Sequence, residues 1–172
     1  MPMAAAAESP AATGGPRTIA LVDDHQLVRV ALQIALRERP DLRLVGGFAT
    51  VEALLQAEVE PALVLLDLRL GDGSSPAQNV QRIRETGAEV LVFTSGEDSY
   101  LVREALQADV LGVLRKSASV QALVEAVDRA ARGLPVVTSD WAHAVELDPR
   151  LSDAGLSPQE ARVLQRFADG AN

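Results

Sequence analysis

The sequence contains no cysteine, and its 172 residues include only three phenylalanines, one tyrosine and one tryptophan. Without cysteine the chain forms no disulfide, no thiolate metal site and no cysteine nucleophile. No apolar run approaches the roughly 20 residues that a membrane-spanning helix needs. The N-terminus lacks the basic start of a secretory signal. We therefore expect a cytoplasmic protein that does not contact a membrane.

Positive charge is also scarce. The formal net charge is -8 at pH 7, which argues against a chain built to bind nucleic acid as a whole. Of the 16 basic residues, Lys116 is the only lysine. Hydrophobic residues make up 48% of the sequence, which is enough for a packed core and excludes disorder throughout the chain.

Short apolar runs alternate with helical patterns through most of the chain. The predicted strands are residues 18–22, 42–46, 62–67, 89–94 and 112–116. The predicted helices are residues 25–38, 51–57, 76–85, 99–108 and 119–132. In the first helix, apolar residues at helical spacing are Leu27, Val30, Ala31 and Ile34. Strict alternation favours an α/β fold, a doubly wound five-stranded parallel sheet with helices on both faces.

Composition changes divide the chain into four predicted parts. Residues 1–16 are rich in Ala, Pro and Gly, which is typical of a disordered tail, and residues 17–133 form the α/β domain. Residues 134–154 are predicted to be a linker. Residues 155–172 begin a further helix, because Ser157 and Glu160 form a capping box and Pro158 suits the first helical position.

Polar residues stand where the predicted strands end. Asp23 and Asp24 follow the first strand, Asp67 ends the third, Thr94 ends the fourth and Lys116 ends the fifth. Carboxyl ends of parallel strands meet at one edge of a sheet, so these side chains are expected to converge. Three adjacent carboxylates repel one another, and Mg²⁺ is a hard cation that prefers such oxygen ligands.

This set of side chains suits phosphoryl transfer. With the metal bound, one carboxylate can act as a nucleophile toward phosphorus, and the reaction needs little beyond positioning and charge neutralisation. Lys116 can pair with one phosphoryl oxygen and the Thr94 hydroxyl can donate to another. Taken singly, each residue has a simpler explanation; Asp24, for example, could cap the first helix. Their shared position at carboxyl ends favours the functional interpretation.

Four motifs carry a resemblance to a known family: LVDDH (21–25), LVLLDLRL (63–70), VLVFTS (90–95) and GVLRK (112–116). With these motifs, residues 17–133 resemble the receiver domain of two-component response regulators. The segment LSPQEARVLQRFADG resembles the opening of the LuxR-type helix-turn-helix domain of the NarL/FixJ subfamily. The resemblance implies a flavodoxin-like sheet of strand order 2-1-3-4-5, followed by a linker and one effector helix.

The resemblance also implies a role for each site residue. Asp67 matches the phosphoacceptor, and Thr94 and Lys116 match the residues that sense and bind the phosphoryl group. The implied protein ligands of Mg²⁺ are Asp23, Asp24, Asp67 and the backbone carbonyl of Arg69. Asp24 would bind the metal directly, whereas Asp23 would act mainly through metal-bound water. Such a domain is a switch with at most slow autodephosphorylation, not a turnover enzyme.

The implied partners follow from the same family. The phosphoryl donor would be a phosphohistidine on a sensor histidine kinase, and the regulator would form a homodimer that controls transcription. Promoter DNA would be bound only by the full-length protein. A DNA-reading recognition helix is missing from the 172 residues, so we expect this chain alone not to bind DNA specifically.

Two positions depart from the family pattern. Val113 stands where an aromatic residue usually reports phosphorylation by rotating, which a valine cannot do. Gly71 stands where proline is usual, which predicts a more mobile loop. Val113 keeps open a second hypothesis, a phosphorylation-independent receiver that acts as a protein-interaction module. A phosphatase with an aspartyl intermediate is disfavoured, because Arg69 occupies the position of its second aspartate.

Two further residues could suggest ligand binding. His25 adjoins the acidic pair, but at the start of the first helix it is predicted to lie at the rim as a bystander. Trp141, the only tryptophan, falls in the predicted linker and is expected to pack against the domain.

Overall fold

The computed structural model describes residues 15–95 and 99–138. Three sequence predictions fall outside these residues: the disordered tail up to residue 14, the linker beyond Thr138 with Trp141, and the effector helix at 155–172. In the part of the chain that is described, no helix combines the length and the apolar character needed to cross a bilayer.

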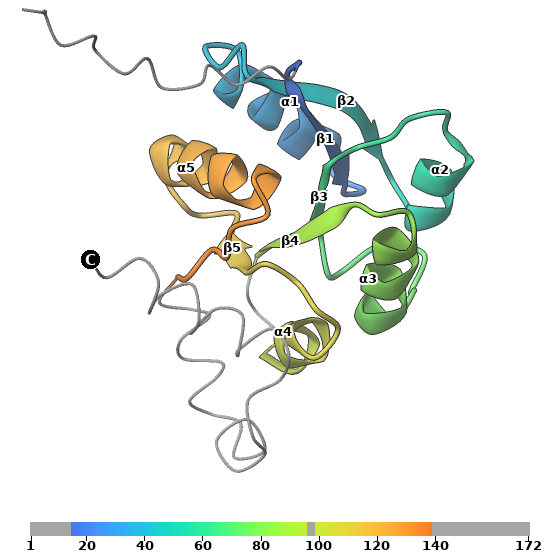
Figure 1. Cartoon of the computed structure of the whole chain (residues 1–172). Coiled ribbons are helices and arrows are strands. Elements are labelled where there is room, and N and C mark those ends of the chain that lie inside the picture. Colours follow the sequence, from blue (N-terminus) through green and yellow to red (C-terminus); the bar gives the residue numbers. More distant parts are fainter. Residues whose placement is uncertain (1–14, 96–98, 139–172) are drawn as a thin grey trace, which may run out of the picture.

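Five parallel strands form one sheet in the order β2-β1-β3-β4-β5 (Figure 1). The strands are β1 (Arg17–Val22), β2 (Leu42–Phe48), β3 (Leu63–Leu66), β4 (Glu89–Thr94) and β5 (Val113–Arg115). The helices are α1 (Gln26–Ala35), α2 (Val51–Gln56), α3 (Pro76–Glu85), α4 (Ser99–Leu106) and α5 (Val120–Ala131). The predicted doubly wound α/β fold and its strand order are confirmed.

Successive strand residues point to opposite sides of the sheet, and helices bury both sides. One core packs strand residues against side chains of α2, α3 and α4, namely Val51, Leu54, Val80, Ile83, Val102 and Ala105. The other packs strand residues against side chains of α1 and α5, namely Leu32, Leu123, Ala126, Val127 and Ala130. All four residues of β3 are fully buried, which explains why its sequence is continuously apolar.

Three of the helices begin with a side-chain cap. Thr50, Ser75 and Ser119 accept a hydrogen bond from the backbone of α2, α3 and α5 respectively, as N-cap residues do. The N-cap of α1 is His25, whose side chain makes no capping hydrogen bond. Asp24 is therefore not the cap of α1, and the acidic pair that precedes this helix is available for other contacts.

Helix α1 is apolar on two sides. The side packed on the sheet carries Val28, Leu32 and Ala35. The stripe that predicted the helix faces solvent instead: Leu27 is 79% exposed, Val30 43% and Ile34 58%. The helix also ends at Ala35 rather than at residue 38, because the following residues form turns. Exposed apolar stripes of this kind commonly mark a surface that contacts another molecule.

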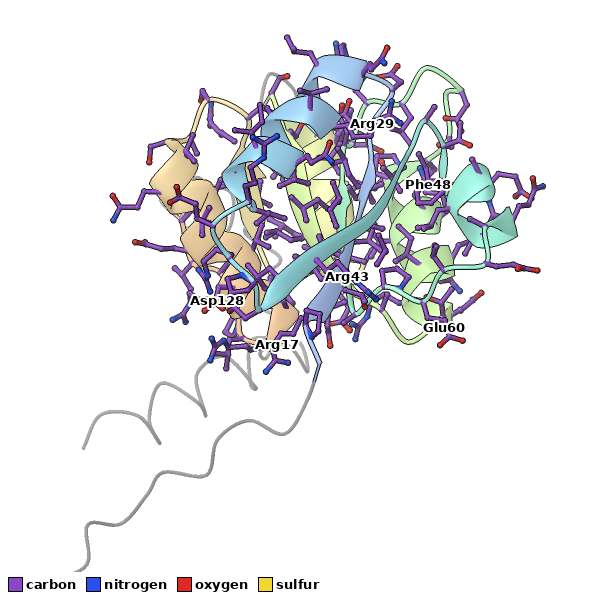
Figure 2. All side chains as sticks on the ribbon, turned by 90° about the horizontal axis from the view of Figure 1, so that it is seen from above. Arg17, Arg29, Arg43, Phe48, Glu60 and Asp128 are labelled. Carbon is purple, nitrogen blue, oxygen red and sulfur yellow. The ribbon has the colours of Figure 1, made fainter. Side chains whose placement is uncertain are left out.

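Strand β2 is two residues longer than the sequence predicts. The added residues are Gly47 and Phe48, which pair with β1 as Gly46 does, although glycine is a weak strand former. A Cβ atom at Gly46 would lie 2.6 Å from the ring of Phe48, and one at Gly47 would lie 2.2 Å from Cδ of Arg29. Figure 2 shows Arg29 and Phe48 near the same end of β2. The two glycines thus leave room for neighbouring side chains that the local pattern does not reveal.

An ion-pair network joins the turn before β2 to α5. Arg39 Nη2 lies 2.8 Å from Asp41 Oδ2 and 2.8 Å from Asp128 Oδ1, and Arg132 also contacts Asp128. In Figure 2, Asp128 lies with Arg17 at the end of the sheet opposite to Arg29 and Phe48. Hydrogen bonds and charge from Arg39 hold the pKa of Asp41 below its ordinary value.

We expect Arg39→Met to lower the free energy of unfolding by about 1 kcal/mol at neutral pH, as for a partly exposed ion pair. Because the pKa of Asp41 is lowered on folding, the stabilisation is present above the ordinary pKa of about 3.9 and is lost as the pH falls through the folded value. Urea unfolding at pH 7 and pH 3 measures this. The control is Arg37→Met, at an exposed arginine of the same turn; an equal loss at both pH values would contradict the prediction.

Candidate functional site

Backbone hydrogen bonds fix the carboxyl edge of the central strands. The N–H of Asp23 donates to the carbonyl of Phe48 at 2.8 Å, and the N–H of Asp67 donates to that of Val22 at 2.9 Å. Each aspartate therefore stands directly after the last residue of its strand, β1 or β3, while its backbone is still held by a neighbouring strand. Both carboxylates are buried; Asp67 is only 4% exposed.

Lys116 bridges these two aspartates. Its Nζ lies 2.7 Å from Asp67 Oδ2, to which it donates a hydrogen bond, and 2.6 Å from Asp23 Oδ2. Burial by itself lowers the pKa of Lys116, but its close contacts with the negatively charged Asp23 and Asp67 outweigh this effect, so the pKa is raised above its ordinary value. Lys116 is therefore a charged ammonium at neutral pH, directly beside the proposed phosphoacceptor.

Asp24 and His25 form the exposed rim of the cluster. His25 Nδ1 lies 3.0 Å from Asp23 Oδ1 and 2.8 Å from Asp24 Oδ1, and its backbone N–H donates to Asp23 Oδ1 at 2.8 Å. His25 lies at the rim as predicted, but it contacts both carboxylates and is not a bystander. The N–H of Gly71 donates to Asp24 Oδ2 at 3.1 Å.

The remaining predicted residues surround Asp67. Thr94 is buried at the end of β4, and its carbonyl accepts the N–H of Lys116 at 2.8 Å. The N–H of Arg69 donates to Asp67 Oδ1 at 3.3 Å, which holds residue 69 against the cluster. All of the predicted site residues thus gather at one edge of the sheet. The use of the Arg69 carbonyl as a ligand stays a prediction.

The charges of the cluster do not balance. Asp23, Asp24 and Asp67 carry three negative charges against one ammonium, which leaves two uncompensated when His25 is neutral. Asp23 Oδ2 is buried and makes no hydrogen bond of acceptable geometry with the described residues, although it lies beside Lys116. Ligand atoms of the three aspartates and His25 all lie within 4.8 Å of one another. A divalent cation that prefers oxygen, such as Mg²⁺, fits this donor set and charge.

The structure adds contacts that the sequence did not suggest. Gly71 supplies a backbone donor to Asp24, which the proline usual in the family could not do because it has no N–H. In the same loop, Asp72 accepts hydrogen bonds from the backbone and hydroxyl of Ser74, and Ser74 accepts one from Asn79. The loop is therefore well connected, and its predicted mobility stays a prediction.

Val113 lies in the core. Its side chain is 1% exposed and belongs to the cluster that packs against α2, α3 and α4. Its pairing partner in β4 is Val92. A buried β-branched side chain has little rotamer freedom, so a rotating side chain at this position is not available to report a change at Asp67.

Residues 19–128 match the family model of the response regulator receiver domain. The sheet order, the acidic cluster and the lysine that bridges it agree with this match. The chain therefore belongs to the response regulator receiver family, whose members are phosphorylation-dependent switches.

Individual proteins place the chain more narrowly. The nitrate/nitrite response regulator protein NarL of Escherichia coli K12 is 26% identical over 166 residues, which cover 90% of this chain and 76% of NarL. The transcriptional activator protein ExaE of Pseudomonas putida is 32% identical over 163 residues, which cover 88% of this chain and 76% of ExaE. A LuxR-family response regulator structure from Aurantimonas sp. SI85-9A1 matches with a TM-score of 0.67 and 28% identity, over 77% of this chain and 96% of that chain. The receiver is thus of the NarL/LuxR type.

Proposed function

We propose that this chain is the receiver part of a transcriptional regulator that accepts a phosphoryl group on Asp67. The observation that carries the proposal is the bridge between Asp67 and Lys116 at 2.7 Å, within a cluster that has two uncompensated negative charges. A nucleophilic carboxylate, a fixed ammonium and a site for a divalent cation are the parts that phosphoryl transfer to an aspartate needs.

In the proposed reaction, one carboxylate oxygen of Asp67 attacks the phosphorus of a phosphohistidine on a sensor histidine kinase. The new O–P bond forms as the N–P bond breaks, and the leaving imidazole is neutralised by a proton. Asp67 then carries an acyl phosphate. The product is the phosphorylated chain itself, which acts as a signal, so we expect no turnover beyond slow autodephosphorylation.

The position of each residue around Asp67 suggests its role in the proposed reaction. Lys116 already lies against Asp67 and is proposed to pair with a phosphoryl oxygen once the group is attached. The hydroxyl of Thr94, which is at the end of the neighbouring strand β4, is proposed to donate to a second oxygen. The N–H of Arg69 holds the other carboxylate oxygen of Asp67, and so orients the attacking one.

The proposed ligands of Mg²⁺ are Asp23, Asp24, Asp67 and the backbone carbonyl of Arg69. When bound, the ion would neutralise charge on the transferring phosphoryl group. Asp23 is held from both sides by Lys116 and His25, which suits a role through metal-bound water, whereas the more exposed Asp24 is accessible for direct binding.

The test of this function is mass spectrometry of the intact chain after incubation with acetyl phosphate and Mg²⁺. We expect a mass gain of one phosphoryl group, because the carboxylate can displace acetate from this donor. Chelation of the metal with EDTA should suppress the gain. A chain that stays unmodified with both reagents present would favour the alternative, a phosphorylation-independent interaction module, which the buried Val113 supports.

The surrounding parts of the protein are proposed from the sequence. Residues 17–133 would be the receiver, residues 134–154 the linker and residues 155–172 the start of a LuxR-type helix-turn-helix domain. We propose that the full-length regulator acts in the cytoplasm and binds promoter DNA, whereas this chain alone does not bind a specific sequence. A gel-shift assay that showed selective operator binding by the 172 residues would contradict this.

We further propose that the phosphorylated receiver forms a homodimer through the exposed apolar stripe of α1. We expect Ile34→Asp to weaken a dimer induced by beryllofluoride and Mg²⁺ by a factor of at least about 10 in Kd, because it places a charge in an apolar contact. Ile34 is exposed near the C-terminal end of α1, whereas the acidic cluster precedes the first residue of this helix, so we expect the variant to leave the site intact. Sedimentation velocity measures the effect.

The control for Ile34 is Tyr100→Asp. Tyr100 is also exposed, at 65%, but it lies on α4 and so over the opposite face of the sheet. We expect this variant to dimerise like the unaltered chain. The reverse result, with Tyr100→Asp monomeric and Ile34→Asp dimeric, would place the interface on the α4 face instead.

A further inference from the structure

The end of α5 turns the chain back toward the sheet. Gly133 has φ +70°, and its N–H bonds to the carbonyl of Ala130 while that of Leu134 bonds to Arg129. This pair of bonds around a left-handed glycine is a Schellman motif, which ends a helix and redirects the chain. The redirected residues 135–138, named the strap here, then run beside β5, as the orange end of the described chain in Figure 1 shows.

The strap extends the sheet at its β5 edge. Val136 forms a parallel bridge with Gly112, and its N–H donates to the carbonyl of Leu111 at 2.7 Å. The hydroxyl of Thr138 donates to the carbonyl of Val113 at 2.8 Å. The strap thus satisfies the carbonyl groups of the two residues on either side of Gly112, as edge groups of a sheet need to be.

Side chains fit the strap closely to this edge. Val136 is buried in the core between α1, α5 and the sheet. A Cβ atom at Gly112 would lie 2.2 Å from the carbonyl oxygen of Val136, so glycine is required there for the backbones to approach. The guanidinium of Arg129 donates two hydrogen bonds to the carbonyl of Pro135, at 3.2 and 3.3 Å. The strap, which forms the start of the predicted linker, is therefore held to the receiver by specific contacts.

The strap and the phosphoryl site share one short strand. β5 has only three residues, Val113–Arg115; the strap is bonded to its first residue, and Lys116 follows its last. Lys116 is in turn bonded to Thr94 by its N–H and to Asp67 by its ammonium group. The series of contacts that joins Asp67 to Thr138 therefore passes through a single strand. It involves the backbone of Val113 and not its immobile side chain.

We infer that docking of the strap on β5 is coupled to phosphorylation of Asp67, and that phosphorylation loosens it. The inference rests on the proposed function. Lys116 Nζ now lies 2.7 Å from the Asp67 carboxylate, so a phosphoryl group on Asp67 would occupy this space and displace Lys116 at the end of β5. A shift of the short strand β5 would in turn weaken its hydrogen bonds to the strap. The strap leads in sequence from α5 toward residues 155–172, so its release would report phosphorylation to the effector segment.

The test is hydrogen exchange of the Val136 amide in the 172-residue chain, followed by NMR with and without beryllofluoride and Mg²⁺. We expect exchange at Val136 to become faster by a factor of about 5 or more, since local opening sets the exchange rate and couplings between sites are commonly of this size. The reference is the amide of Ala62, which bonds to Thr18 at the opposite end of the sheet and should not change.

A matched pair of variants tests the hydrogen bond itself. Thr138→Val removes the donor to Val113, whereas Thr86→Val removes a threonine hydroxyl that donates to the carbonyl of Ile83 at 2.7 Å, remote from β5. Coupling is reciprocal, so Thr138→Val, which weakens strap docking, should tighten beryllofluoride binding, by at most the factor by which beryllofluoride speeds exchange at Val136. Thr86→Val should leave beryllofluoride binding unchanged.

The possible outcomes separate the inference from the proposed function. If beryllofluoride shifts the amide signals of Asp67 and Lys116 but leaves Val136 exchange and the Thr138→Val affinity unchanged, the coupling is refuted and the phosphoacceptor role stands. If beryllofluoride shifts no signal at Asp67 or Lys116, both proposals fail. Slower exchange at Val136 would overturn the stated direction.

Discussion

Asp67→Asn is expected to lose the phosphoryl adduct while it keeps the fold. An amide in place of the carboxylate has no nucleophilic oxygen of comparable reactivity, so the rate of mass gain from acetyl phosphate should fall by a factor of at least about 1,000. The amide oxygen can still accept the hydrogen bond from Lys116 that the Asp67 carboxylate accepts now. The variant also removes one negative charge from a crowded cluster, so its thermal stability should not decrease.

The control for this experiment is Asp72→Asn in the loop that follows. Asp72 is exposed and bonds only locally, to the backbone and hydroxyl of Ser74 in the described contacts. We expect this variant to gain the phosphoryl group at the normal rate. Adduct formation that survived in Asp67→Asn would mean that another side chain is the acceptor, and the proposed function would have to be abandoned.

The second large effect is expected from Lys116→Met in the absence of Mg²⁺. The change leaves Asp23 and Asp67 close together without their shared ammonium, and both carboxylates are buried. Removing one partner of a buried ion pair typically costs about 3 kcal/mol in the free energy of unfolding. Urea unfolding at pH 7 measures the loss. Arg115→Met, at the exposed cation next to it in β5, should cost about 0.5 kcal/mol or less.

Mg²⁺ should restore part of the loss in Lys116→Met. Without the lysine, the cluster has three uncompensated negative charges instead of two, so it should bind the divalent cation more tightly. A ligand that binds only the folded state stabilises it in proportion to RT ln(1 + [L]/Kd). The increase in Tm on addition of Mg²⁺ should therefore be larger in the variant than in the unaltered chain. An equal or smaller increase would show that the cation does not bind at this cluster.

The architecture was largely readable from the sequence because each pattern had one dominant cause. Continuous apolar runs such as residues 63–66 belong to strands that are covered on both faces, and strict alternation of strands and helices leaves few topologies. The bounds of α3 and β4 agree with the prediction. Shifts elsewhere, such as the end of β5 at Arg115 instead of residue 116, are of the size that hydrogen-bond fraying produces.

Local patterns failed where a distant neighbour decides the conformation. Strand β2 continues past its predicted end through Gly47 and Phe48. Gly47 lies against Arg29 from α1, and no local propensity contains that information. In α1, apolar residues occur on both sides, and periodicity alone does not tell which side the sheet covers. Tertiary packing settles both questions.

The contacts within the site were also predictable only in part. That Asp23, Asp67 and Lys116 meet was predictable from topology, since parallel strands place their carboxyl ends together. The contacts of His25 and Gly71 with Asp24 were not, because they depend on loop conformation and on a backbone N–H that no motif records. The one clue at residue 71 was the missing proline, which can now be understood as a gained donor.

The Val136–Gly112 bridge has a consequence for the choice of a stable receiver fragment. A shorter chain that ended at Gly133 would keep α5 but would leave the carbonyls of Leu111 and Val113 open to solvent. An edge strand with unpaired backbone groups is a template for pairing with a strand from another molecule. The strap thus protects this edge of the sheet against pairing with another molecule, and a stable receiver fragment should include it.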